Sequence, residues 1–566
     1  MIGPETDIAQ WMHAWKYRSP GESFGEYGNR VASALQDSPE HFRQTRAILR
    51  DQRFLPGGRI QSAMGALRQS TPYNCFVMET INDDMSSILG VFGDSVETMR
   101  RGGGVGYDFS NLRPWGDRIK TLDSIASGPV SFMGIYDAGC KTVSSAGHRR
   151  GAQMGVLRVD HPDIERFINA KQNSTNLTAF NISIAITDEF MRAVEEGTDF
   201  TLRFEGEDRG SVDARALWES IMRSTWEWAE PGVIFIDTVN RLNNLWYCET
   251  IAATNPCGEH PLPPNGACLL GSFNLAKYVG TYASGKRHFD WAQFEADIPP
   301  IVRAMDNVVD RARYPLMAQE QEASSKRRMG LGVTGLATAG EALNHPYGSE
   351  GFLKFEARVL SKLRDAAYSA SIELAKEKGP FPLYDRGEYM RSKFIETLPT
   401  AIRQEMYEHG IRNSHLTSIA PTGTISITAD NVSSGIEPVF SHRYDRTIQV
   451  EGGERVVAVE DYGQRVFGTH SKIATDCTAD DHLGVLLTAQ KYVDSACSKT
   501  CNVDPDMPWS EFKDIYMKAW KGGAKGITTF NPSGKRFGVL QAPDEPSVEE
   551  PLACYIDPDT GERSCE

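Results

Sequence analysis

Apolar residues along most of the chain alternate between short runs and helical spacing. From residue 352 to 377 they recur at steps of three and four, which predicts an amphipathic helix ended by Gly379 and Pro380. Short apolar runs predict strands at 74–78, 105–109, 180–186, 233–236, 268–273, 416–420 and 527–530. Strands separated by helices predict an α/β fold with a largely parallel sheet, either open or closed into a barrel.

The two ends of the chain depart from this pattern. Residues 1–65 carry aromatic and aliphatic residues at loosely helical spacing, so we expect a helical N-terminal segment that stops near a turn at 55–58. Residues 66–540 show no low-complexity stretch or repeat and are expected to form one body. Residues 541–566 are acidic, proline-rich and aperiodic, which predicts a flexible C-terminal tail.

Composition and charge narrow the class of protein. The 566 residues include 60 Lys+Arg and 75 Asp+Glu, a net charge of −15, which argues against nucleic acid or an anionic membrane as the main partner. No apolar run is long enough for a membrane span, and the first twenty residues lack a secretory signal, so a cytoplasmic protein is expected. A local basic pocket for a phosphorylated small molecule remains compatible with this charge.

The ten cysteines are too sparse for a disulfide-stabilised secreted scaffold. Three interpretations of the cysteines remain: buried apolar thiols, a metal site and redox catalysis. Cys477, Cys497 and Cys501 do not combine with His470 or His482 at zinc-finger spacing, so buried thiols are favoured there and no metal site is expected.

Two glycine-containing segments are candidates for phosphate binding. Residues 102–106 follow a predicted helix and lead into a strand, the reverse of the order in a dinucleotide-binding loop, so a nicotinamide site is not favoured. A second segment, Pro421, Thr422, Gly423 and Thr424, follows the predicted strand at 416–420. Backbone N–H groups and hydroxyls at such a turn can hold a phosphate, and an ordinary β–α turn is the alternative.

A third segment combines the side chains of a catalytic site. Asn255, Cys257 and Glu259 occupy alternate positions, and Cys268 follows eleven residues after Cys257. On extended backbone the three side chains would point to one side, although Pro256 requires a loop or an edge position. An amide, a thiol and a carboxylate at one point are typical of catalysis, while a loop with a chance cysteine explains this motif alone equally well.

The motif from Asn255 to Glu259 resembles the finger loop of ribonucleotide reductase catalytic subunits, and other segments agree with that family in their order. The resemblance covers roughly residues 50–566. It assigns a redox cysteine on the first strand to Cys75, a specificity loop to 144–156, a substrate phosphate turn to 421–424 and two tail cysteines to Cys554 and Cys565. The substrate-binding residues that it implies are Asn74, Arg150, Pro421, Thr422, Gly423 and Thr424.

The resemblance implies an architecture and a chemistry. The architecture is a ten-stranded α/β barrel of two parallel five-stranded half-barrels around the finger loop. The activity is reduction of ribonucleotides to 2′-deoxyribonucleotides, with Cys257 as a transient thiyl radical, Glu259 as base and Asn255 orienting the ribose. Cys75 and Cys268 would supply two electrons and become a disulfide. Cys554 and Cys565 would then reset it together with a thioredoxin or glutaredoxin-like reductant.

The radical source can be read from the same resemblance. Class I enzymes receive the radical from a metal-bearing second subunit through paired tyrosines, and residues 526–531 contain no tyrosine. This segment, residues 149–151 and the spacing from Cys257 to Cys268 resemble class II enzymes, which use adenosylcobalamin. A class I large subunit and a non-catalytic nucleotide-binding regulator are the alternatives.

The resemblance also implies an allosteric site at a homodimer interface, for a dNTP or ATP effector with Mg. Acidic side chains there suit ribose hydroxyls and cations suit a triphosphate. Only 74 residues precede Cys75, which leaves little room for the family's N-terminal ATP-cone domain, so no switch of overall activity is expected. The effector residues that it implies are Asp83, Ser86, Arg113, Ile119 and Lys120.

Overall fold

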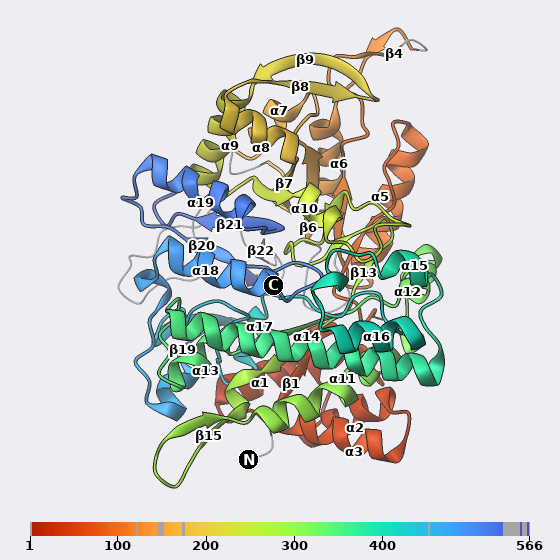
Figure 1. The fold of residues 1–566 in the computed structure, drawn as a ribbon. Coiled ribbons are helices and arrows are strands. Elements are labelled where there is room, and N and C mark those ends of the chain that lie inside the picture. Colours follow the sequence, from red (N-terminus) through yellow and green to blue (C-terminus); the bar gives the residue numbers. More distant parts are fainter. Residues whose placement is uncertain are drawn as a thin grey trace.

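The computed structural model describes residues 3–68, 70–119, 122–143, 152–172, 176–450 and 453–535, together with the backbone of 555–556 and 563–564. The side chains of 446–450 and 453–455 are outside this description. Among the helices of these ranges, none is both long enough and apolar enough to cross a bilayer. Figure 1 shows the N-terminal helices at the end of the molecule opposite to the β8–β9 hairpin (Asp199–Phe204 and Glu207–Asp213).

The N-terminal segment is helical, as predicted. It forms α1 (Asp7–Tyr17), α2 (Phe24–Leu35) and α3 (Pro39–Arg50), whose N-termini are capped by Thr6, Ser23 and Ser38. The turn predicted at 55–58 is wrong in its first half, because β1 (Phe54–Pro56) pairs with β14 (Leu270–Asn274) before α4 (Gly58–Ala63) begins. The side chains of Phe54 and Leu55 are buried, and the antiparallel pairing satisfies their backbone.

The largest sheet has eight strands. Five of them run parallel, and α5 (Met85–Arg100), α6 (Pro129–Thr142), α7 (Ile164–Ile168), α8 (Asp188–Glu196) and α9 (Ala214–Trp228) lie in the connections between them. On either side of these five, the pairs β13–β2 and β10–β21 are antiparallel, and the edge strand β20 is parallel to β21. The spatial order is β13 (Ala267–Cys268), β2 (Cys75–Val77), β3 (Gly104–Asp108), β6 (Gln153–Arg158), β7 (Phe180–Ile186), β10 (Gly232–Phe235), β21 (Gly526–Phe530) and β20 (Thr500–Asn502).

A second sheet consists of β1, β14 and β17 (Gly330–Thr334). Single parallel bridges extend it, from Leu331 to Thr417 and from Ile419 to Cys497, so the strand predicted at 416–420 pairs only at isolated positions. The prediction of an α/β fold with a large, mainly parallel sheet is confirmed. The described ladders form these two sheets instead of one continuous ten-stranded barrel, and the ten-stranded closure stays a prediction.

The helix predicted at 352–377 is α14 (Glu350–Lys378), which packs against α11 (Trp291–Arg311). By contrast, the loop predicted at 144–156 is wrong from Gln153 onward, where β6 begins. Residues 153–157 are all buried, as in a central parallel strand, so they lack the polar alternation that marks a half-exposed strand.

The remaining elements complete the molecule. The helices are α10 (Ile236–Arg241), α12 (Met317–Lys326), α13 (Leu336–Ala342), α15 (Arg386–Tyr389), α16 (Thr400–His409), α17 (Gly423–Ile427), α18 (Ala479–Gln490) and α19 (Trp509–Lys521). The hairpins pair β4 (Arg118–Ile119) with β5 (Ser124–Ile125), β11 (Ala253–Thr254) with β12 (Pro261–Leu262), β15 (Val279–Thr281) with β16 (Arg287–Phe289), β18 (Arg443–Val450) with β19 (Gly453–Glu460), and β22 (Tyr555–Ile556) with β23 (Arg563–Ser564).

Candidate active site

The segment from Asn255 to Glu259 is the turn of the β11–β12 hairpin. The N–H of Gly258 donates to the Asn255 carbonyl (3.1 Å), and the N–H of Asn255 donates to the His260 carbonyl (3.2 Å). Gly258 has a φ of +82°, which favours glycine. The extended backbone considered for these residues is therefore wrong, because Pro256 and Gly258 close the chain into a tight turn.

Two glycines of β3 make room for this hairpin. A Cβ on Gly106 would lie 2.0 Å from the Thr254 carbonyl oxygen, and a Cβ on Gly104 would lie 3.1 Å from the Cys75 sulfur. The glycine run at 102–106, which is in the wrong order for a dinucleotide loop, thus includes one position, Gly106, where β3 approaches the hairpin too closely for any side chain. At the second, Gly104, a Cβ would be tight against Cys75 and against Pro256 of the hairpin (3.2 Å). Glycine inside a strand is a known sign of such an approach.

The hairpin turn is held by polar contacts from both sheets. Asn181 of β7 donates through Nδ2 to the Pro256 carbonyl (3.0 Å). From the other direction, the Ser418 hydroxyl (2.9 Å) and the Ala496 N–H (3.0 Å) both donate to the Glu259 carbonyl. The turn is therefore fixed between the two sheets.

Burial differs sharply among the three chemical groups of the turn. Asn255 and Glu259 are 0% and 2% exposed, whereas Cys257 is half-buried. The Asn255 Oδ1 accepts from the His260 N–H (2.9 Å), but its Nδ2 has no hydrogen-bond partner among the described residues. A buried amide donor beside a thiol that solvent can reach is the arrangement expected where a polar substrate completes the site.

Cys75 and Cys268 are brought together next to this turn. They are paired residues of antiparallel β2 and β13, both are buried, and neither is in a disulfide. Burial raises the pKa of the Cys268 thiol well above its usual range, and the nearby Glu259, Cys75 and Cys257 raise it further. The structure therefore places Cys257 and Glu259 of the hairpin turn close to the Cys75–Cys268 pair. Asn255, the fifth residue predicted to be catalytic, lies in the same hairpin turn as Cys257 and Glu259.

The predicted substrate turn adjoins this site through Ala420, which packs in the same apolar cluster as Cys75 and Cys268. Thr422 has a φ of +57°, and its Oγ1 accepts from the Gly435 N–H (2.7 Å). Pro421 precedes it, and Gly423 and Thr424 open α17. Asn74 is also adjacent, and its buried Oδ1 has no hydrogen-bond partner among the described residues.

Of the predicted effector residues, Asp83 and Ser86 lie at the start of α5, and Arg113 contacts Asp83. Arg113 donates through Nε and its backbone N–H to the two carboxylate oxygens of Asp83, Ser86 is exposed in the first turn of α5, and Ile119 lies on β4. The Arg166 guanidinium lies 3.9 Å from the ring centroid of the half-exposed Trp115, a contact that the sequence did not predict. The predicted site residues Lys120, Arg150, Cys554 and Cys565 lie outside the described residues.

The remaining described cysteines follow the buried-thiol prediction with one exception. Cys140, Cys497 and Cys501 are buried and Cys477 is half-buried, and burial raises the pKa of Cys477 and Cys501 to about 12. The prediction is wrong for Cys248, which is exposed in the turns that follow α10.

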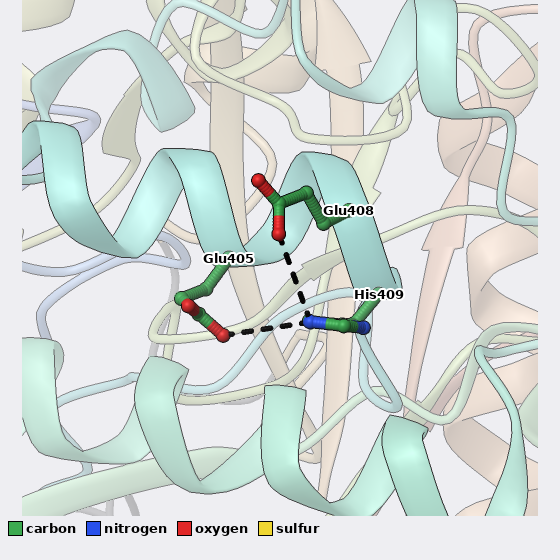
Figure 2. Close-up of side chains that lie close together, drawn as sticks. All are labelled: Glu405, Glu408 and His409. Carbon is green, nitrogen blue, oxygen red and sulfur yellow. Dashed lines mark ion pairs between the residues drawn. The ribbon is translucent and has the colours of Figure 1, made fainter.

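One cluster of possible metal ligands lies on the surface of α16. The His409 Nε2 is 3.7 Å from a Glu405 oxygen and 3.9 Å from a Glu408 oxygen, and all three residues are exposed (Figure 2). Glu405 also pairs with Lys376 at 2.9 Å. Glu405 and His409 are four residues apart on one helix, the ordinary spacing of a surface pair, and Glu408 is the sequence neighbour of His409, so we assign the cluster no role.

Comparison with known proteins agrees with this geometry. The family model described as "Ribonucleotide reductase, barrel domain" matches residues 73–530. A protein of Mycobacterium tuberculosis named vitamin B12-dependent ribonucleoside-diphosphate reductase is 35% identical, over 97% of this chain and 81% of the relative. A protein of the same name from Thermoplasma acidophilum is 32% identical, over 83% and 62% of the two chains. The cysteine pair and the hairpin turn follow one another along the chain in the same order as in that family. This chain therefore belongs to the ribonucleotide reductases.

Proposed function

We propose that this chain reduces ribonucleotides to 2′-deoxyribonucleotides in a radical reaction that requires adenosylcobalamin. The observation that carries the proposal is the buried hairpin turn, which holds Asn255, Cys257 and Glu259 beside the opposed thiols of Cys75 and Cys268. The names of the relatives from Mycobacterium tuberculosis and Thermoplasma acidophilum support it, since both are called vitamin B12-dependent.

The five residues divide the chemistry between them. A sulfur radical on Cys257 takes the hydrogen atom from C3′ of the ribose, while Glu259 accepts the proton of the 3′-hydroxyl. The free amide Nδ2 of Asn255 orients the ribose. Water leaves from C2′, and the Cys75–Cys268 dithiol gives up two electrons and two protons as it becomes a disulfide. The hydrogen then returns from Cys257 to C3′, which restores the sulfur radical.

The residues around Cys257 fit an external radical source. When bound, adenosylcobalamin would supply a carbon radical able to take the hydrogen of the Cys257 thiol, and Cys257 is half-buried whereas Asn255 and Glu259 are buried. The described residues of β21 contain no tyrosine. The hydroxyl of Tyr516 is hydrogen-bonded to that of Thr529 on β21 (2.8 Å). Its ring packs against Phe512 in the main apolar core, and not in the separate apolar cluster that contains Cys75 and Cys268.

We further propose that the two sheets form the family's ten-stranded barrel, between a helical segment at 1–65 and a redox tail at 541–566. The antiparallel contacts of β13 with β2 and of β10 with β21 support this, because they mark the two seams where half-barrels of opposite direction would meet. Cys554 and Cys565 would pass electrons from a thioredoxin or glutaredoxin-like protein. Such a cycle needs a reducing compartment, consistent with the cytoplasm.

A homodimer with a dNTP or ATP effector and Mg is part of the same proposal. Met85 and Leu89 on α5 and Ile135 on α6 are 53%, 48% and 40% exposed, unusual for large apolar side chains on helices that pack together. Asp83 and Arg113 lie beside the start of α5, where an effector would meet both copies.

One assay tests the proposed activity. Purified chain is supplied with dithiothreitol, ribonucleoside di- or triphosphates and dNTP effectors, with and without adenosylcobalamin. We expect deoxyribonucleotide only when the cofactor is present. Turnover that instead requires a metal-bearing second subunit would identify a class I large subunit. Absence of product under every condition would identify a non-catalytic nucleotide-binding regulator.

A further inference from the structure

The N-terminal segment is fastened to the loop that follows α17 through the carboxylate of Asp430. Its Oδ1 accepts from the Glu5 N–H (2.8 Å), the Thr6 N–H (2.8 Å) and the Thr6 hydroxyl (3.0 Å), and its Oδ2 accepts from the Glu5 N–H (3.0 Å). Asp430 is 1% exposed. Four contacts to one buried carboxylate form a strong attachment, because a hydrogen bond to an ionised acceptor is stronger than one between neutral groups.

α17 depends on this segment for its packing. A helix of five residues does not persist alone in water, so its conformation comes from tertiary contacts. Met12 of α1 packs with Ile427, and Tyr17 packs in the cluster that contains Ile425. At the end of α17, the Gln52 side chain donates through Nε2 to the Thr428 carbonyl (2.9 Å).

The same loop returns from Asp430 to the start of α17. Asp430 and Asn431 have φ values of +64° and +60°, which turn the chain back. The Ser434 hydroxyl then lies 3.0 Å from that of Ser426 in α17. The N–H of Gly435 donates to the Thr422 Oγ1 (2.7 Å), which ties the loop to the turn at 421–424.

We propose that Asp430 is a positioning residue through which the N-terminal segment holds the turn at 421–424 in its substrate-binding shape. The inference rests on the proposed role of that turn in binding the substrate phosphates. Because a preformed site loses less entropy on binding, loosening the attachment weakens nucleotide binding. The cysteines and Glu259 lie on other elements, so the rate of the chemical step at saturating substrate should change little.

The test compares Asp430→Gly with Asp430→Asn. Glycine tolerates the positive φ but removes every acceptor, whereas asparagine tolerates the same φ and keeps one acceptor oxygen. We expect Asp430→Gly to raise KM roughly tenfold with kcat within about twofold, the size expected for losing hydrogen bonds to a charged group. Asp430→Asn should have a KM much closer to that of the unmodified chain than Asp430→Gly has. By calorimetry without cofactor, Asp430→Gly should weaken binding of a ribonucleoside diphosphate but not of the matching nucleoside.

Thr424→Val, a change in the turn itself, separates failure of this inference from failure of the proposed substrate turn. If Thr424→Val weakens diphosphate binding and Asp430→Gly does not, Asp430 has no positioning role, while the turn keeps its own. If Thr424→Val has no effect on diphosphate binding, the turn is not the phosphate site and the inference falls with it. Should Asp430→Gly fail to fold, Thr6→Val is the second variant; it removes the hydroxyl that donates to Asp430 (3.0 Å) and accepts from the Ala9 N–H at the start of α1 (3.4 Å). It must still raise KM without changing kcat, and an unchanged KM overturns the proposal.

Discussion

Cys75 and Cys268 lie directly opposite each other across the antiparallel strands β2 and β13. Opposed residues in such a ladder have Cα atoms about 4.5–5.5 Å apart, and disulfides span Cα separations of about 4.4–6.8 Å. The two thiols can therefore close into a disulfide and reopen without a change in strand pairing.

Turnover without an external reductant should oxidise this pair. We expect one substrate equivalent to convert Cys75 and Cys268 to a disulfide, detected by mass spectrometry as a crosslinked peptide. Cys75→Ser and Cys268→Ser should each stop deoxyribonucleotide formation. Cys248→Ser changes an exposed cysteine on a different segment and should leave both results as in the unmodified chain. A crosslink between other cysteines after turnover would contradict the assignment.

Cys257→Ser should abolish reduction, because an oxygen radical is much harder to form than a sulfur radical. The expected fall in product formation is on the order of 10³-fold or more, as for removal of a reacting group in other enzymes. Product formation is measured at saturating substrate, adenosylcobalamin and dithiothreitol. Cys140→Ser, at a buried cysteine on α6, is the matched change and should retain activity if the variant folds. Appreciable turnover by Cys257→Ser would exclude Cys257 as the radical carrier.

Removal of residues 552–566 should separate two reductants. A small dithiol reaches the Cys75–Cys268 disulfide by diffusion, so turnover with dithiothreitol should persist. Turnover with thioredoxin should stop, since a protein reductant needs the tethered pair Cys554 and Cys565 as a carrier. The double change Cys554→Ser, Cys565→Ser in the full chain should reproduce the truncation. Equal loss with both reductants would assign the tail a structural role instead.

Acid should destabilise the protein partly through His260. Burial lowers the pKa of its imidazole to about 3, with smaller contributions from Arg328 and Lys525. The unfolded chain binds this proton below about pH 6.5 while the folded protein does not, so stability present at pH 7 is lost as the pH falls. At pH 5 the loss for one such group is about 2 kcal/mol.

His260→Gln should remove that part of the acid sensitivity. Between pH 7 and pH 5, the free energy of unfolding, measured by urea titration, should fall by about 2 kcal/mol less than in the unmodified chain. Equal pH dependence in the His260→Gln variant and the unmodified chain would show that this ring is protonated in the folded state.

Leu89→Asp on α5 should weaken the proposed homodimer. A carboxylate placed on an apolar contact surface is desolvated without a partner when the copies associate. Light scattering after size exclusion should show monomer for this variant at concentrations where the unmodified chain is dimeric. Met317→Asp, on a more exposed apolar residue of α12, is the control and should remain a dimer. The opposite result would move the interface from α5 to α12.

Local patterns in the sequence were sufficient for α14, for the strands around β3, β7, β10 and β21, and for naming Asn255, Cys257 and Glu259 as candidate catalytic residues. The three- and four-residue spacing of α14 records which face is buried, and no other part of the chain is needed to read it. The chemistry of Asn255, Cys257 and Glu259 could be inferred because the three side chains are close in sequence. Their role with Cys75 and Cys268 followed from resemblance to a family.

Contacts between distant segments decided the rest. β6 is buried on both faces, so its sequence has no alternation, and β1 is a strand only because β14 lies beside it. The need for glycine at positions 104 and 106 is explained only by the β11–β12 hairpin, which lies against β3. Asp430 gains its partners Glu5 and Thr6 from more than 400 residues away. Sequence alone identified the side chains that are predicted to carry the chemistry, and tertiary structure decided what holds them in place, because the holding contacts join residues that no local pattern relates.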